Sequence, residues 1–238
     1  MNIPGKRSLR EEEGRSAEKA DGLFGKNKTL TNYDRMQEDA RRLFLTLDFD
    51  EGCRRVGLLP TEAGVSLRAF GEACFVRRSD GEVLDGRGEK APFGYAMSVY
   101  DVLGRTGEAP RLSGSFVPTS ALHGIMGSNS VHEDLGKNGG AYFDGKSAAL
   151  REVCRRRGGT PGTKGDVSFI LPVFDFFPVE LRFWEADDEF PALLQWFWDA
   201  NALQFAHYET LWYMSGTLLE RLRAETEGIF AQNQGRKP

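Results

Sequence analysis

The stretch from Phe174 to Leu222 constrains the fold most, because it concentrates aromatic side chains and acidic groups in one part of the chain. Three of the four tryptophans lie between Trp184 and Trp198, beside an acidic run that ends at Glu189. Burying aromatic surface next to charge is costly unless the charges are paired or hydrated. The stretch is therefore either a core with a helix start or the rim of a site.

Apolar residues at helical spacing predict helices in several other segments. Thr31 and Asp34 are spaced as a capping box, and the stripe that follows continues to Leu47. The stripe from Tyr208 to Leu222 is the clearest in the chain. Helices are also predicted over residues 48–56, 92–104, 147–157 and, as a short helix, 190–199.

Alternating apolar residues predict strands between these helices. Residues 65–84 are expected to form a three-stranded meander with a tight turn at Asp80-Gly81. Further strands are predicted over residues 112–117, 167–173 and 179–184. Residues 118–145 are glycine-rich and aperiodic, which predicts a long loop. Because helices and strands are grouped rather than alternating, we predict an α+β fold with a mostly antiparallel sheet packed by several helices.

The composition predicts one such domain with a tail at each end. Residues 1–30 are charged and poor in large apolar side chains, so a mobile tail is expected there. The domain is predicted to cover residues 31–226, and residues 227–238 are expected to fray.

Charge and cysteine usage argue against several classes of protein. A net charge of -4 over 238 residues gives no basic surface for nucleic acid. No apolar run approaches the ~18 residues of a membrane span, and no secretory signal is visible, so a cytoplasmic protein is expected. Cys53, Cys74 and Cys154 are far apart, which indicates neither a disulfide framework nor a zinc site.

Residues 140–147 match the P-loop pattern for nucleotide phosphates, with Lys146 and Ser147 at its end. A helix is predicted to follow, as the motif requires. The preceding residues do not form a buried strand, and Tyr142 and Phe143 are bulky for a loop that wraps an anion. A nucleotide hydrolase and a simple turn into a helix are both open interpretations.

The acidic run Asp187-Asp188-Glu189 also has two interpretations. Its carboxylates could serve a metal-dependent hydrolase as ligands or as acid and base. Alternatively, Asp187 or Asp188 caps the helix predicted to follow, with Pro191 in its first turn.

The three histidines lack partners at diagnostic spacing. His207 near the last helix could be a ligand or a general base, and a capping role is the simpler alternative. His123 and His132 lie in the glycine-rich segment without a metal-binding motif, so no metal site is predicted. On the predicted short helix, Trp196 and Trp198 would point to different sides, with one in the core and the other available to a partner.

Several residues together resemble an uncharacterised family, a domain of unknown function common in anaerobic bacteria. The resemblance covers about four-fifths of the chain. It rests on these segments: Asn32-Tyr33-Asp34, Phe70-Gly71, Asp80-Gly81, Gly139-Gly140, Tyr142-Phe143, Phe183-Trp184, Asp187 to Pro191, Phe197, Asp199, Glu209 and Leu219 to Leu222. Relatives occur alone or fused to a four-cysteine iron–sulfur domain of the type found in corrinoid proteins. The resemblance implies, by association, a role beside corrinoid or iron–sulfur chemistry.

The leading hypothesis is an accessory domain that binds a small molecule or a protein partner, with no nucleic acid or membrane partner. Aromatic side chains would supply stacking area, and acids would orient a polar or cationic group. A metal- or nucleotide-dependent hydrolase and a protein-interaction module are the alternatives, and neither the reaction nor the cofactor is predicted. The expected ligand-binding residues are Trp184, Asp187, Asp188, Glu189, Asp199, Glu209, Gly139, Gly140 and Tyr142.

Overall fold

The computed structural model describes residues 31–122 and 130–234, and the side chains of residues 135–229 within the second range. The chain divides into two compact units, Met1–Arg35 and Met36–Pro238. In the first unit, the Thr31 hydroxyl accepts from the Asp34 N–H (3.1 Å) and the Asp34 carboxylate accepts from the Thr31 N–H (2.8 Å). The predicted capping box is therefore confirmed, while residues 1–30 and His123 lie outside the described residues.

The described strands form one antiparallel sheet in the order β3-β2-β1-β6-β7-β8-β4, with β5 paired to β6 outside that path. The predicted α+β fold with an antiparallel sheet is confirmed. The strands are β1 (Gly64–Ala69), β2 (Glu72–Arg77), β3 (Val83–Leu84), β4 (Phe116–Pro118), β5 (Thr160–Pro161), β6 (Val167–Phe174), β7 (Phe177–Trp184) and β8 (Leu193–Asp199).

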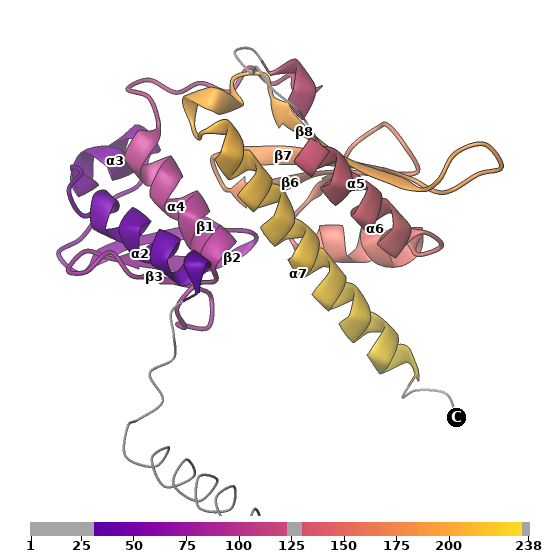
Figure 1. Ribbon diagram of the computed structural model, residues 1–238, viewed down its shortest axis with the longest axis horizontal. Helices are drawn as coiled ribbons and strands as arrows, with labels where there is room; N and C mark the ends of the chain where they lie inside the picture. The colour runs from indigo at the N-terminus through magenta and orange to yellow at the C-terminus, as the bar shows by residue number, and fades with distance from the viewer. Residues whose placement is uncertain (1–30, 123–129, 235–238) are drawn as a thin grey trace, which may run out of the picture. The chain divides into compact units, whose positions relative to one another are not determined.

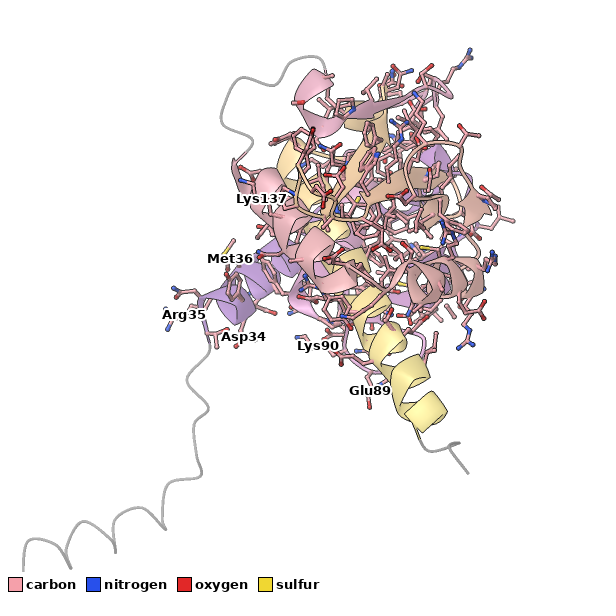
Figure 2. The ribbon with its side chains drawn as sticks, turned by 90° about the vertical axis from the view of Figure 1, so that its right-hand side faces the viewer. Asp34, Arg35, Met36, Glu89, Lys90 and Lys137 are labelled. Carbon is pink, nitrogen blue, oxygen red and sulfur yellow. The ribbon has the colours of Figure 1, made fainter. Side chains whose placement is uncertain are left out.

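Helices pack against one face of this sheet (Figure 1). Helix α5 lies on β8, α6 lies on β6, and α4 packs along α7. Figures 1 and 2 both show the last turns of α7 extending beyond the strands. The helices are α2 (Asn32–Phe44), α3 (Phe49–Arg55), α4 (Phe93–Arg105), α5 (Ser130–Phe143), α6 (Ser147–Arg156) and α7 (Tyr208–Gln234), with 3-10 turns at Thr119–Ala121 and Ala202–Gln204.

Alternation along the strands separates a core face from a polar face. On the core face, Leu181 of β7 lies opposite Trp196 of β8, and Val179 lies opposite Trp198. On the other face of β7 the sequence places Glu180 and Arg182. The core therefore lies between the sheet and the helices.

Two predictions on secondary structure are wrong. The short helix predicted over residues 190–199 is strand β8, in which Trp196 and Trp198 both face the core and are 5% and 0% exposed. The protein-interaction hypothesis required one of these tryptophans to be exposed to a partner, and both are buried. The more exposed apolar side chains of this unit include Met36 (45%), Leu43 (53%) and Leu59 (88%).

The second wrong prediction is the long loop over residues 118–145, which contains helix α5. Its glycines lie on one helical face at positions 136, 139 and 140, where they allow the helix to approach β8 closely. Lys137 lies on the exposed side of the same helix (Figure 2). The glycines therefore mark close packing rather than flexibility.

Boundaries differ in three smaller ways. The strand predicted over residues 112–117 is limited to β4. The turn between β6 and β7 falls at Asp175 and Phe176, so β7 begins at Phe177 rather than at the predicted residue 179. Helix α7 continues to Gln234, past residue 227, where the C-terminal tail was predicted to begin.

Candidate binding site

The predicted site residues after β7 lie on a tight turn. Trp184 is half-buried at the end of β7, and Asp187, Asp188 and Glu189 are exposed. The Asp187 carboxylate accepts hydrogen bonds from the N–H groups of Glu189 (2.9 Å) and Phe190 (2.7 Å), which lower the pKa of Asp187. Asp187 therefore caps a turn, and the prediction that it caps a helix is wrong because a strand follows.

Glu185 occupies the helix terminus where the P-loop interpretation would place a phosphate. Its carboxylate accepts from the Gly145 N–H (2.8 Å) and from the Ser147 hydroxyl at the start of α6. The Ser147 bond and then the Gly145 bond lower the pKa of Glu185. The carboxylate therefore binds the turn that precedes α6 and the first residue of that helix, where the positive end of the helix dipole favours a negative charge.

The rest of the P-loop pattern does not form a phosphate loop either. Residues 140–143 are the last turn of α5, so they are helical. The Lys146 ammonium donates to the Tyr142 carbonyl (2.5 Å) and lies 4.0 Å from the centre of the Tyr142 ring. The P-loop interpretation is wrong, because the segment is a helix–turn–helix joint capped by Glu185.

We expect Glu185→Ala to lower the free energy of unfolding by about 1–2 kcal/mol, because the start of α6 loses its cap. The pKa of Glu185 is lower in the folded chain than in the unfolded chain. The contribution of Glu185 to folding stability is therefore present above its unfolded-state pKa and should be lost as the pH falls through its folded-state pKa. Urea unfolding at pH 7 and pH 3 measures both effects. Glu189→Ala is the control; equal loss in both variants would contradict the capping role.

Gly139 and Gly140 lie against β8 rather than around an open site. A Cβ at Gly139 would lie 3.3 Å from Leu194 Cβ, and one at Gly140 would lie 2.2 Å from the Ala192 carbonyl oxygen. Tyr142 is turned toward α7, where its hydroxyl donates to the Arg223 carbonyl (3.2 Å). The structure thus brings the end of α5 beside the turn after β7. The two segments pack directly against each other there and leave no space for a ligand around Gly139 and Gly140.

Asp199 lies at the other end of β8 from Trp184, and Glu209 lies in the first turn of α7. Leu193 pairs with Trp184, and Asp199 lies six steps of roughly 3.3 Å further along β8, about 20 Å in all. Asp199 is 1% exposed and its carboxylate accepts from the N–H groups of Ser113 (2.9 Å) and Gly114 (2.8 Å). The predicted site residues therefore do not share one cavity.

His207 binds a carboxylate of a neighbouring helix. The backbone N–H of His207 donates to Asp101 (2.7 Å), and its Nδ1 lies 2.9 Å from the same carboxylate. This arrangement joins the start of α7 to α4, which matches the capping alternative. Among the side chains of residues 31–122 and 135–229, no group of three or more His, Cys, Asp or Glu is placed to hold a metal ion, and the side chain of His132 lies outside these ranges.

A surface hollow of about 340 Å³ opens at the edge of β1. Leu58, Leu67 and Phe176 form its apolar walls, and Ser66, Arg68 and Asp175 supply its polar groups. We call the hollow lined by these six residues the β1-edge hollow. Its volume lies near the lower end of ligand pockets, which span about 300–1,000 Å³.

The charged groups of the β1-edge hollow are accessible. Arg68 Nε lies 3.7 Å from Asp175 Oδ1, and the two side chains are 58% and 63% exposed. Arg68 also donates to the Gly71 carbonyl (3.0 Å), which fixes its direction. Phe176 stacks on Phe174 with ring centres 5.4 Å apart, so the aromatic wall is anchored in β6. The hollow therefore offers an apolar surface with one cation and one anion at its rim.

The hollow exists because β1 and β6 diverge. Their shared register is limited to Ala69 opposite Phe174. On the same side of β1, the Phe70 N–H donates to the Val173 carbonyl (2.6 Å), and the Gly64 carbonyl accepts from Thr61 N–H (2.8 Å). No described strand pairs with β1 on this side between Gly64 and Arg68.

The sequence contained only part of this site. Ser66 and Arg68 are the polar positions of an alternating strand, and Asp175 and Phe176 lie between the strands predicted over residues 167–173 and 179–184. Nothing local indicates that the two segments meet across more than 100 residues, because their approach depends on the pairing of β1 with β6.

The cysteines are placed in the core. Cys53, Cys74 and Cys154 are 0%, 3% and 0% exposed. Burial raises the pKa of Cys53 to about 11 and the pKa values of Cys74 and Cys154 to about 12. These thiols are therefore protonated near neutral pH.

We expect a thiol-specific disulfide reagent at pH 8 to leave the native protein unmodified over minutes and to titrate all three cysteines in guanidinium chloride. Absorbance of the released thiolate measures the reaction. Rapid modification of one cysteine without denaturant would contradict the packing described here.

Fold and hollow together define a small α+β domain with helices on one face of an antiparallel sheet and a ligand-sized depression at a strand edge. Among the described residues, no helix is both long and apolar enough to cross a membrane.

The chain belongs to the family DUF3786, described as a domain of unknown function, whose match covers residues 48–221. That span includes all six residues of the β1-edge hollow. The predicted membership in a domain-of-unknown-function family is thereby confirmed. Searches of curated proteins and of solved structures each gave no match.

Proposed function

We propose that this domain is an accessory binding domain that holds a small molecule or a segment of a partner in the β1-edge hollow. The observation that carries the proposal is the combination, in one open depression, of apolar walls with Arg68 and Asp175 3.7 Å apart at the rim. Binding sites commonly combine an apolar lining with a few polar groups that fix orientation.

The charges indicate the chemistry of the ligand. Arg68 suits a carboxylate or phosphate, and Asp175 suits an ammonium or amide N–H. Leu58 and Phe176 suit an apolar group between them. A molecule with an apolar body and both kinds of polar group, such as an amino-acid derivative or a short peptide, fits this arrangement.

The experiment is a ligand-observed NMR screen of about a thousand fragments, which include amino-acid derivatives, against the intact chain and two variants. Ser66→Trp fills the hollow from an exposed strand position, and Ser66→Ala is the matched control. We expect hits that bind the native protein and Ser66→Ala but bind Ser66→Trp at least about tenfold more weakly. An absence of hits, or hits that bind Ser66→Trp equally well, would refute the assignment of the site.

We also propose that the domain acts beside corrinoid or iron–sulfur metabolism in an anaerobe. The family resemblance alone supports this part of the proposal. The β1-edge hollow is small for a ligand that must be enclosed, so a corrin ring would lie across it rather than inside it. Titration with hydroxocobalamin tests this version. A change in the cobalamin absorbance that Ser66→Trp abolishes would support it, and an unchanged spectrum would count against it.

A further inference from the structure

We infer that the ligand of the β1-edge hollow is an extended peptide segment that adds to β1 as a further strand. This inference rests on the proposed function and names the class of partner. It follows from the direction of the backbone groups of β1, which the hollow leaves accessible on one side.

The first step is the hydrogen-bond pattern of β1. Strands β1 and β2 pair along their whole length, from Gly64 opposite Arg77 to Ala69 opposite Glu72. In an antiparallel pair, alternate residues direct both backbone groups toward the partner or away from it. Gly64 and Phe70 direct theirs away from β2, since Gly64 binds Thr61 and Phe70 binds Val173.

The second step places the intervening residues. Ser66 and Arg68 have the same parity as Gly64 and Phe70, so their N–H and C=O groups also face away from β2. Beyond the single pair Ala69–Phe174, β6 ends and the chain turns at Asp175. The backbone of Ser66 therefore faces the hollow, where a paired strand would otherwise lie.

The third step is the fit of side chains and charge. A strand added beside Ser66 would direct alternate side chains to the two faces of the sheet. Side chains near Leu58 and Phe176 would meet the apolar walls, while Arg68 and Asp175 are positioned at one end for a carboxylate and an amino or amide group. Main-chain bonds would give affinity and the apolar walls would give specificity, as in other cases of strand addition.

The structure also argues that this edge is available. Exposed strand edges usually carry protective features, such as very short length, proline or covering loops. The two ends of the sheet order are protected in this way, because β3 has two residues and β4 has three. The β1 edge is longer and borders a hollow, which distinguishes it from the protected edges.

The test is selection of phage-displayed random 12-residue peptides on the native chain, followed by affinity measurements with a selected synthetic peptide. Ser66→Pro removes the Ser66 N–H, which faces away from β2, and leaves the β2 side of the ladder intact, since proline is tolerated at such an edge. Ser66→Ala is the matched control. We expect binding to weaken at least about tenfold in Ser66→Pro and to change less than about twofold in Ser66→Ala.

Hydrogen exchange in the native protein gives a second readout that does not depend on a variant. Saturating peptide should slow exchange of the Ser66 amide at least about tenfold and leave that of Leu67, which faces β2, nearly unchanged. No enriched peptide, equal binding to Ser66→Pro, or an unchanged Ser66 amide would overturn the inference. If fragments bind in a Ser66→Trp-sensitive manner while no peptide is enriched, the inference fails and the proposed function stands.

Discussion

Gly140→Ala is expected to destabilise the domain by about 3 kcal/mol, the upper part of the range for overpacking a core. A Cβ at this position would lie 2.2 Å from the Ala192 carbonyl oxygen, 2.6 Å from its carbonyl carbon and 2.8 Å from Leu193 Cα. These are backbone atoms of β8 and its approach, so they cannot rotate away as a flexible side chain would. Helix α5 would have to lift from the sheet.

Gly216→Ala in α7 is the matched control for Gly140→Ala. Gly216 is also helical, and a Cβ there would meet no atom within 4 Å. Because alanine is a better helix former than glycine, this change should stabilise the protein by up to about 1 kcal/mol. Thermal and urea unfolding followed by circular dichroism compare the two variants. Equal effects of the same sign would refute the close helix–strand contact.

Removing the charge of Glu180 is expected to cost about 3–5 kcal/mol, because it would leave Arg182 buried without its partner. The two residues are 5% and 9% exposed, and Arg182 Nη2 donates to the Glu180 carboxylate at 2.6 Å. Ser168 donates to the other carboxylate oxygen at 3.0 Å, and the guanidinium lies 3.6 Å from the Phe197 ring centre.

A thermodynamic cycle separates the pair from its surroundings. Glu180→Gln should show the full loss, whereas Glu180→Leu combined with Arg182→Met should be within about 1 kcal/mol of the native protein, since apolar replacement of a buried pair is often neutral or favourable. Guanidinium unfolding at pH 7 gives each value. A double variant as unstable as Glu180→Gln would show that the pair does not act as a unit.

The same pair predicts a pH dependence. Burial raises the pKa of Glu180, but the hydrogen bonds from Arg182 and Ser168 outweigh burial, so the pKa is lowered overall. A carboxyl group with a lowered folded-state pKa stabilises the fold above its unfolded pKa, and that stabilisation is lost as the pH falls through the folded value. Below about pH 4 the native protein should therefore lose stability relative to the double variant, which lacks this carboxyl group.

The fold class was predictable because most elements carry a local signal. The meander from β1 to β3 followed from alternation and from Asp80-Gly81, and α7 followed from its apolar stripe. Strand β8 was predicted as a helix because Asp187 and Pro191 resemble a helix start, whereas Trp196 and Trp198 pack two residues apart on one face. Turn capping and helix capping use the same residue types, so the local pattern could not separate them.

The candidate site was much less predictable than the fold. Trp184 and the acidic run were chosen for their composition, and the structure shows that Asp187 and Asp199 bind backbone N–H groups of nearby turns. Glycines in α5 suggested a loop because glycine is common in both loops and close contacts. The β1-edge hollow depends on where two distant strands part, and that position is set by long-range register rather than by any short motif.

The meeting of β1 and β6 at one residue pair also divides the sheet mechanically. The three strands on one side (β1 to β3) and the five on the other (β4 to β8) share Ala69–Phe174 and the adjoining Phe70–Val173 bond, whereas β6 and β7 pair along nearly their whole length. Most of the cohesion between the halves must therefore come from the helical layer, where α4 packs on α7 and Arg157 donates to the Phe70 carbonyl. The relative position of the two halves should therefore depend on the packing of these helices more than on shared ladder bonds.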